Sequence, residues 1–240
     1  MRQSNFYWSI VFLCVLGVAV ETGVFAGEIT PVSATISRSK PEPGEVREFE
    51  VRVDNKPVGT HLLTIKSVGD TQQVSFQTDV KIDVIVYAYT FKLEGKEVWR
   101  EGRVETASVR CEDGGKKRSF TLKTDGCHQE IAFNGKPISC SSPCLMTTAY
   151  WRLPPQDVRD STLTIIDVDN GRAQAATLEY VGTETITCAG RTLNCRHFKI
   201  DGPSPAELWF DEQERLACQK SIEQGHHMEL RLKQIRVSKE

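Results

Sequence analysis

Residues 74–93, VSFQTDVKIDVIVYAYTFKL, decide the fold class of this chain. Up to Val86 the even positions are mostly apolar and the odd positions mostly polar, as in a strand that buries one face. From Tyr87 to Leu93 the apolar side chains move to the odd positions. A change of phase without a turn signal predicts a bulge or a sharp bend, and either would curve a sheet.

The same alternation recurs along the chain. Phe49, Val51 and Val53 alternate with charged residues, and a second change of phase separates Leu232 from Ile235. Further strand-sized segments cover residues 62–68, 97–111, 117–123, 129–133, 162–168, 173–181, 183–188, 193–200, 206–210, 215–223 and 227–237. Turn signals separate many of them, including Gly114-Gly115, Asn134-Gly135, Asn170-Gly171, Ala189-Gly190 and Gln224-Gly225.

Short strands joined by hairpin turns predict an all-β domain over residues 45–240. We expect a strongly curved antiparallel sheet or a partial barrel. Residues 124–160 lack clear periodicity and contain cysteines, so they are predicted to form an irregular insertion or lid. Residues 27–44 are rich in proline and serine and are predicted to form an extended leader.

The first 26 residues have the features of a cleavable signal peptide. A basic Arg2 precedes an uncharged apolar run, and Val24-Phe25-Ala26 offers a small-residue cleavage site. An uncleaved anchor is the alternative, but the run spans about 17 residues, which is short for a membrane helix. Leu13 before Cys14 argues against a lipid anchor. We expect a periplasmic or secreted product with no transmembrane anchor after cleavage.

Charge and motifs exclude several classes of function. The chain has 30 basic and 32 acidic residues in an even mixture, which argues against a nucleic-acid partner. It contains no P-loop, dinucleotide-binding glycine pattern, zinc-protease motif or serine nucleophile elbow. The sequence therefore identifies no catalytic residue, metal ligand or cofactor.

The cysteines are interpreted first as disulfide candidates, because an exported protein meets an oxidising compartment. Cys127, Cys140 and Cys144 lie together in the irregular segment, and Cys188 and Cys195 flank a predicted hairpin turn. A zinc site of Cys127, His128, Cys140 and Cys144 is the alternative, although the spacing matches no recognised zinc motif.

Aromatic residues are the best candidates for a ligand cleft. On a curved sheet they could line an apolar concave face, although aromatic residues on strands more often form core. The candidates are Tyr87, Tyr89, Phe91, Trp99, Trp151 and Trp209.

Four short segments resemble a family of uncharacterised bacterial exported proteins that is defined by a domain of unknown function. They are Phe49-x-Val51-x-Val53-Asp54-x-Lys56-Pro57-Val58-Gly59, Tyr87-x-Tyr89 with Glu97-x-Trp99, Tyr150-Trp151, and Trp209-Phe210-Asp211 with Arg215-Leu216. The resemblance covers residues 45–237. It implies a curved antiparallel sheet loosely similar to periplasmic lipoprotein carriers, and it implies no activity and no catalytic residue. The cysteine-containing segment 111–144 departs from the pattern.

Three functions remain open. The first is an exported, non-enzymatic protein that binds an apolar small molecule or lipid on a concave sheet. The second is a structural or interaction protein of the cell envelope whose concave face is filled core. The third is a thiol-dependent or metal-dependent hydrolase, which would require groups such as Cys127, His128, Cys140, Cys144 and His197 to converge.

Overall fold

A computed structural model describes residues 44–84, 87–126, 128–139, 146–159, 162–223 and 225–237. Over these ranges the protein is all-β, as predicted, apart from the short helix α1 (Gln156–Arg159). The strands in chain order are β1 (Glu45–Val53), β2 (Lys56–Val68), β3 (Thr71–Val84), β4 (Tyr87–Arg100), β5 (Arg103–Asp113), β6 (Lys116–Asp125), β7 (His128–Phe133), β8 (Lys136–Ile138), β9 (Met146–Thr147), β10 (Leu163–Ile166), β11 (Ala173–Cys188), β12 (Arg191–Asp201), β13 (Ala206–Phe210), β14 (Leu216–Glu223) and β15 (His226–Val237).

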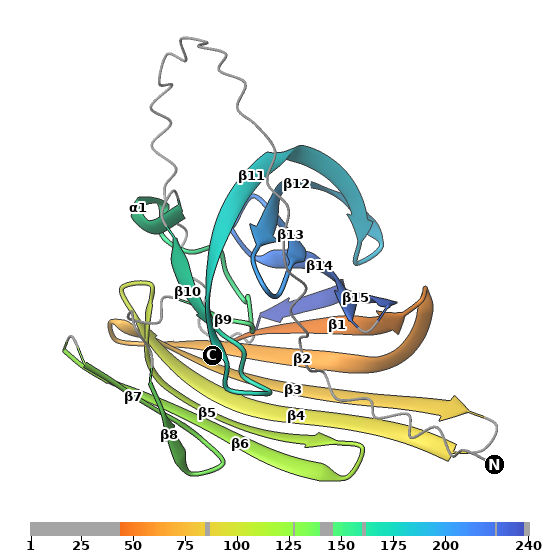
Figure 1. The fold of residues 1–240 in the computed structure, drawn as a ribbon. Coiled ribbons are helices and arrows are strands. Elements are labelled where there is room, and N and C mark those ends of the chain that lie inside the picture. Colours follow the sequence, from red (N-terminus) through yellow and green to blue (C-terminus); the bar gives the residue numbers. More distant parts are fainter. Residues whose placement is uncertain are drawn as a thin grey trace, which may run out of the picture.

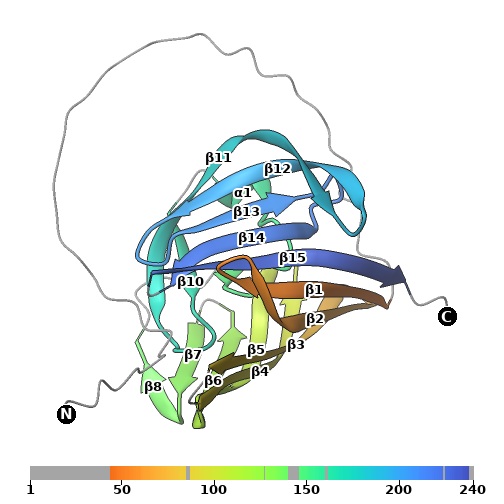
Figure 2. The ribbon, with the colours of Figure 1, turned by 90° about the vertical axis from the view of Figure 1, so that its right-hand side faces the viewer.

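The described strands form one 15-stranded sheet that curls on itself without closing (Figure 1). Its order is β8-β7-β6-β5-β4-β3-β2-β1-β15-β14-β13-β12-β11-β10-β9. Strand β1 pairs with β15, so the two ends of the domain lie side by side at the middle of the sheet (Figure 2). All pairings are antiparallel except β9 with β10.

The change of phase in residues 74–93 marks a hairpin between β3 and β4, so the prediction of a bulge or a sharp bend within one continuous strand is wrong. Val84 pairs with Tyr87, Val80 with Phe91 and Phe76 with Gly95. In this register an even residue of β3 always faces an odd residue of β4, so both apolar sets lie on one face of the sheet. The β-branched residues around the turn conceal it, because they look like continuous strand.

The structure also tests the predicted bulge near Leu232 and two predicted strand boundaries. The bulge predicted near Leu232 is confirmed, since Glu48 pairs with Gln234 but Phe49 pairs with Leu232. Segments 173–181 and 183–188 are one strand, β11, with a register shift between Tyr180 and Gly182. Residues 97–111 were expected to be one strand, but a turn divides them into β4 and β5, with positive φ at Glu101 (51°) and Gly102 (79°).

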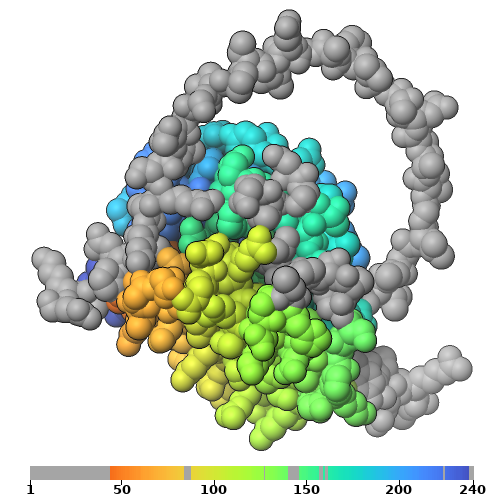
Figure 3. Space-filling model, turned by 90° about the vertical axis from the view of Figure 1, so that its left-hand side faces the viewer, coloured from red at the N-terminus to blue at the C-terminus, as the bar shows by residue number. Residues whose placement is uncertain are grey.

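The two edges of the sheet approach each other through side chains. Gly171 has a φ of 72°, and a Cβ built on it would lie 2.8 Å from the Phe133 ring on β7. Figure 3 shows this face, where the green surface of β7 and β8 borders the sea-green surface of the segment around β10. This contact brings the two edges together where backbone pairing between β8 and β9 is absent from the described residues.

Residues 150–153, which follow β9, pack into the core. Trp151 and Leu153 are fully buried, and the Arg47 guanidinium donates to the Trp151 carbonyl and to the Glu45 carboxylate. The Leu153 N–H donates to the Glu214 carbonyl at 3.3 Å. Residues 148–150, directly before Trp151, form part of the cavity wall.

Candidate ligand cavity

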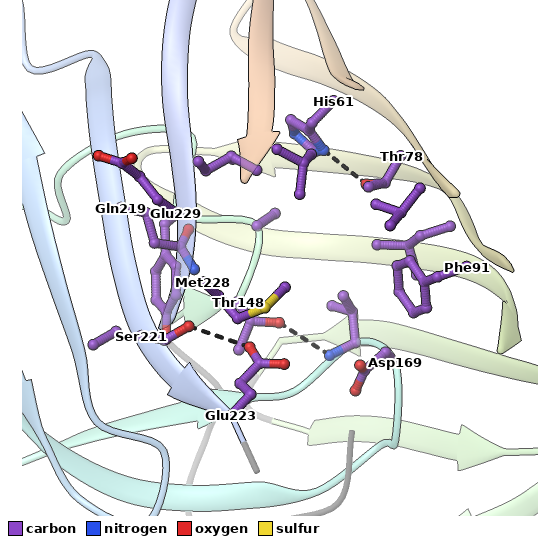
Figure 4. Close-up of a pocket in the computed structure, with 18 of the residues that line it drawn as sticks. His61, Thr78, Phe91, Thr148, Asp169, Gln219, Ser221, Glu223, Met228 and Glu229 are labelled. Carbon is purple, nitrogen blue, oxygen red and sulfur yellow. Dashed lines mark hydrogen bonds between the residues drawn. The ribbon is translucent and has the colours of Figure 1, made fainter. Parts of the chain in front are cut away.

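A cavity of about 220 Å³ lies between the two halves of the curled sheet. Its lining comes from β1–β4, β13–β15 and the loops around residues 149, 168 and 204. The apolar lining residues include Val51, Val53, Phe76, Val80, Ile82, Phe91, Leu93, Ala149, Val168, Ala206, Met228 and Leu230. The polar ones are His61, Thr78, Tyr89, Thr148, Tyr150, Asp167, Asp169, Ser204, Gln219, Ser221, Glu223 and Glu229 (Figure 4).

The apolar wall follows from the β3–β4 hairpin. Val80 and Phe91 are directly paired, as are Ile82 and Tyr89, so four side chains face the cavity from neighbouring positions. Phe76 covers Gly95, where a Cβ would lie 2.1 Å from the ring. Glycine at position 95 therefore lets the Phe76 ring lie flat against β4 at the edge of the cavity.

His61 is a neutral polar group at one side of the cavity. It is 7% exposed and lies between the edge of Phe49 and the face of Phe76, with ring centroids 5.6 and 6.3 Å away. Its Nδ1 lies 2.8 Å from the Thr78 hydroxyl (Figure 4). Burial lowers the pKa of His61 to about 4, so the ring carries no charge at neutral pH.

The opposite side of the cavity carries carboxyl groups from a tight turn. The Asp167 carboxylate accepts hydrogen bonds from the Asp169 backbone N–H at 3.3 Å and from the Asn170 side chain at 2.6 Å. Asp169 is 8% exposed, and its Oδ1 has no hydrogen-bond partner among the described residues. Burial raises the pKa of Asp169 well above its usual value, and the neighbouring Asp167 and Glu223 raise it further.

Glu223 reaches the same side from the end of β14. It accepts a hydrogen bond from Ser221 at 3.2 Å, and burial raises the pKa of its carboxyl group. Behind this side, the Tyr89 hydroxyl donates to Asp113 at 2.7 Å and Arg118 contacts Asp113 at 3.1 Å. The cavity thus has an apolar wall, a neutral histidine and a buried acidic side.

The predicted cleft residues divide between the cavity and the core. Tyr89 and Phe91 line the cavity. Trp99 and Trp151 pack edge to face at 5.7 Å in the filled core. Trp209 lies on the opposite face of β13 from Leu208 and Phe210, stacked on His197 at 4.2 Å. Tyr87 begins β4, and its side chain is outside the described part of the structure.

The disulfide candidates Cys188 and Cys195 form no bridge with each other, because both are free, buried thiols. Cys188 pairs with Arg191 and Cys195 with Glu184, so the two-residue turn sets the cysteines four positions apart along β11. Burial raises the pKa of both thiols, that of Cys195 to about 12, so they are poor nucleophiles. Cys127, Cys140 and Cys144 lie outside the described residues, as do the signal peptide and nearly all of the leader.

The acidic side was missed by the sequence prediction. Asp167-Val168-Asp169-Asn170-Gly171 has the composition of a surface turn, and Glu223 ends a strand of mixed polarity. Only the alternation of Asp167 and Asp169 directly after the apolar strand 163–166 could have suggested burial. Within the described ranges, no three His, Cys, Asp or Glu side chains are arranged to hold a metal ion.

Comparisons with known proteins give a matching family and a solved structure of similar fold. No helix in the described ranges is both long and apolar enough to cross a membrane. No curated protein sequence matches the chain. A crystal structure of a beta-barrel-like protein of domain of unknown function DUF1849 from Brucella abortus is similar in fold, with a TM-score of 0.61 and 7% identity over 82% of this chain and 99% of that chain. A family model described as domain of unknown function DUF6134 matches residues 49–233, which confirms the resemblance to a family without an assigned activity. The chain therefore belongs to the DUF6134 family.

Proposed function

We propose that this domain is a non-enzymatic binding protein that holds a small, largely apolar ligand in the cavity. The supporting observation is a hollow of about 220 Å³ beside a core that is otherwise filled by large side chains. Protein interiors are close-packed, so a cavity of this size among aliphatic and aromatic residues is a binding site for apolar groups.

The volume limits the ligand. Engineered apolar cavities of about 150 Å³ bind benzene, whereas pockets for drug-sized ligands begin at about 300 Å³. The cavity lies between these values, which favours one ring or one short alkyl chain over a two-chain lipid. The alternative of a purely structural envelope protein would leave this hollow without a role.

Isothermal titration calorimetry with 1-octanol tests the proposal. Octanol is neutral and has one short chain, so we expect saturable binding with one site per protein. Ala149→Phe and Ser221→Leu place bulk at the cavity lining and should abolish binding. Ala88→Phe is the matched control, because Ala88 is exposed next to the cavity residue Tyr89 on the same strand. Absence of octanol binding by the parent protein would overturn the proposal.

We also propose that the domain acts outside the cytoplasm after removal of residues 1–26. The supporting observations are the basic start, the apolar run and the cleavage pattern of this segment. Expression in a bacterial host followed by fractionation and intact-mass measurement should give a periplasmic or secreted product that begins at Gly27. A cytoplasmic product that retains Met1 would contradict the proposal.

A further inference from the structure

Resting on the proposed function, we infer that the ligand of the cavity is a small alcohol or phenol whose hydroxyl group forms a hydrogen bond with His61 Nε2. Its apolar part would lie along β3 and β4. The inference concerns the polar group of the ligand, which the size and the apolar wall of the cavity do not specify.

The first support is a ring nitrogen of His61 that the protein leaves without a partner. The side chain lines the cavity and is 7% exposed. Nδ1 contacts the Thr78 hydroxyl at 2.8 Å, and within the described ranges no hydrogen bond involves Nε2. Unlike Asp169 Oδ1, Nε2 is not completely enclosed by protein atoms. Buried polar groups of native proteins nearly always have a partner, so Nε2 indicates one that enters the cavity.

The second support is the way in which neighbouring side chains hold this ring. His61 pairs with Phe49 of β1 and with Thr78 of β3, so the three side chains lie on one face of the sheet. The rings of Phe49 and Phe76 contact the imidazole from two sides, and Thr78 engages Nδ1 (Figure 4). Nε2, the ring nitrogen farther from the backbone, is thereby held in a fixed position pointing away from β2.

The third support is the chemistry of a neutral imidazole. Burial lowers the pKa of His61 to about 4, so at neutral pH one ring nitrogen donates a hydrogen bond and the other accepts one. The Thr78 hydroxyl can serve Nδ1 in either role, and a ligand hydroxyl complements Nε2 in either resulting form. A carboxylate complements only the donor form, and it would meet Asp167, Asp169 and Glu223 in a lining whose described residues include no lysine or arginine.

The fourth support is the apolar path that begins beside His61. Thr78, Val80 and Ile82 follow one another on the same face of β3, and all three line the cavity. Phe91 of β4 pairs with Val80 and widens this path. The strand from Thr78 to Ile82 is about 13 Å long, which is enough for the extended chain of hexanol or octanol. A ligand held at His61 by its hydroxyl group would therefore place its chain against the β3–β4 wall.

The test compares 1-hexanol with 1-chlorohexane, which have the same alkyl chain and differ in carrying a hydroxyl group or a chlorine atom. Isothermal titration calorimetry at pH 7 measures both affinities for the parent protein and for His61→Phe. This variant keeps an aromatic ring between Phe49 and Phe76 but removes both nitrogens. We expect the ratio of hexanol affinity to chlorohexane affinity to fall at least about tenfold. His128→Phe, at an exposed position of β7, is the matched control and should leave the ratio unchanged.

A second measurement uses the parent protein alone. Two-bond proton–nitrogen NMR spectra record the ring nitrogens of the histidines directly. Saturating 1-hexanol should shift the Nε2 resonance of His61, because its hydrogen bonding changes, whereas 1-chlorohexane should shift it far less. The resonances of the exposed His128 should not respond to either compound. If His61→Phe does not fold, the NMR result alone decides.

The outcomes separate this inference from the proposed function. An unchanged affinity ratio in His61→Phe would overturn the inference, and so would an unshifted His61 Nε2 in the protein saturated with hexanol. Water would then be the partner of Nε2, and continued binding of 1-octanol would leave the proposed function standing. Failure of octanol, hexanol and chlorohexane alike to bind would remove the proposed function itself.

Discussion

The core around Trp151 and the cavity beside Tyr89 are built from the same sheet but are packed differently. Around Trp151, indole rings, leucines and isoleucines leave almost no side-chain surface exposed. Beside Tyr89, smaller valines and a ring that covers Gly95 leave a hollow bordered by buried acids. The same sheet therefore packs its side chains tightly in one region and leaves a cavity in another.

Trp151→Ala should have the largest effect. It removes a side chain that is 1% exposed from the filled core, and we expect a loss of about 3–5 kcal/mol in the free energy of unfolding measured by urea denaturation.

The matched pair Val104→Ala and Val80→Ala sharpens the comparison. Val104 is in the filled core and Val80 is at the cavity wall, so Val104→Ala should destabilise the protein more. Equal losses would contradict the difference in packing.

Glu97→Gln should change the pH dependence of stability in the filled region. Glu97 is 1% exposed, and burial raises its pKa to about 7 even though Trp99 donates a hydrogen bond to it at 2.7 Å. The folded state then binds more protons than the unfolded state between about pH 4.5 and 7, so Glu97 lowers stability by about 3 kcal/mol as pH rises through that window. Denaturation at several pH values should show this decline in the parent and its absence in Glu97→Gln.

His61→Gln should reveal a site beside the cavity at which the free energy of unfolding depends on pH in the opposite direction. The folded pKa of His61 is about 4, below its unfolded value, so the unfolded state binds more protons between about pH 4 and 6.5. Stability contributed by this site rises by about 3 kcal/mol as pH increases through that window. The same denaturation series should show a smaller acid sensitivity in His61→Gln. An unchanged slope would show that His61 is hydrated in the folded protein.

Gly171→Ala tests the approach of the two sheet edges. Gly171 and Gly190 have nearly equal φ values, 72° and 71°, but a Cβ at 171 would meet Phe133 whereas one at 190 would meet nothing within 4 Å. Both alanine variants should lose about 1–2 kcal/mol from backbone strain, and Gly171→Ala should lose a further 1–3 kcal/mol or so from overpacking. Thermal denaturation of the pair would measure the difference, and equal values would contradict the edge contact.

The smallest expected effect is that of oxidant on the buried thiols. Alkylation in denaturant followed by peptide mass spectrometry should label Cys188, Cys195 and Cys218 fully, even after exposure of the native protein to oxidised glutathione. Burial raises the pKa of the Cys218 thiol as well, which keeps it protonated and slow to react. A Cys188–Cys195 peptide pair in the oxidised sample would contradict the structure.

Much of the fold could be predicted from local patterns, because alternation and turn chemistry act over a few residues. The turns at Asn134-Gly135 and Ala189-Gly190 have positive φ at both residues, as their sequence predicts. The β3–β4 turn escaped prediction because it lies inside a run of β-branched residues. The disulfide candidates Cys188 and Cys195 flank the Ala189-Gly190 turn, and the observed register confirms that this turn does not place them opposite each other.

The site was less predictable than the fold. Tyr89 and Phe91 could be proposed from their alternation, but Trp99 and Trp151 have the same chemistry and are core. Whether an aromatic residue fills or borders a space depends on the chain that packs against it from far along the sequence. The burial of Asp169 similarly depends on β14 and β15, which follow it by some 50 residues.

The contact between Gly171 and Phe133 lies where the described residues show no backbone pairing between the two sheet edges. In a closed barrel the number of hydrogen-bonded strands and their stagger determine the diameter. Here β8 and β9 end the sheet, and within the described ranges its two edges meet through the Phe133 side chain at Gly171. Hydrogen bonds between strands therefore do not set the circumference of the described domain at this point.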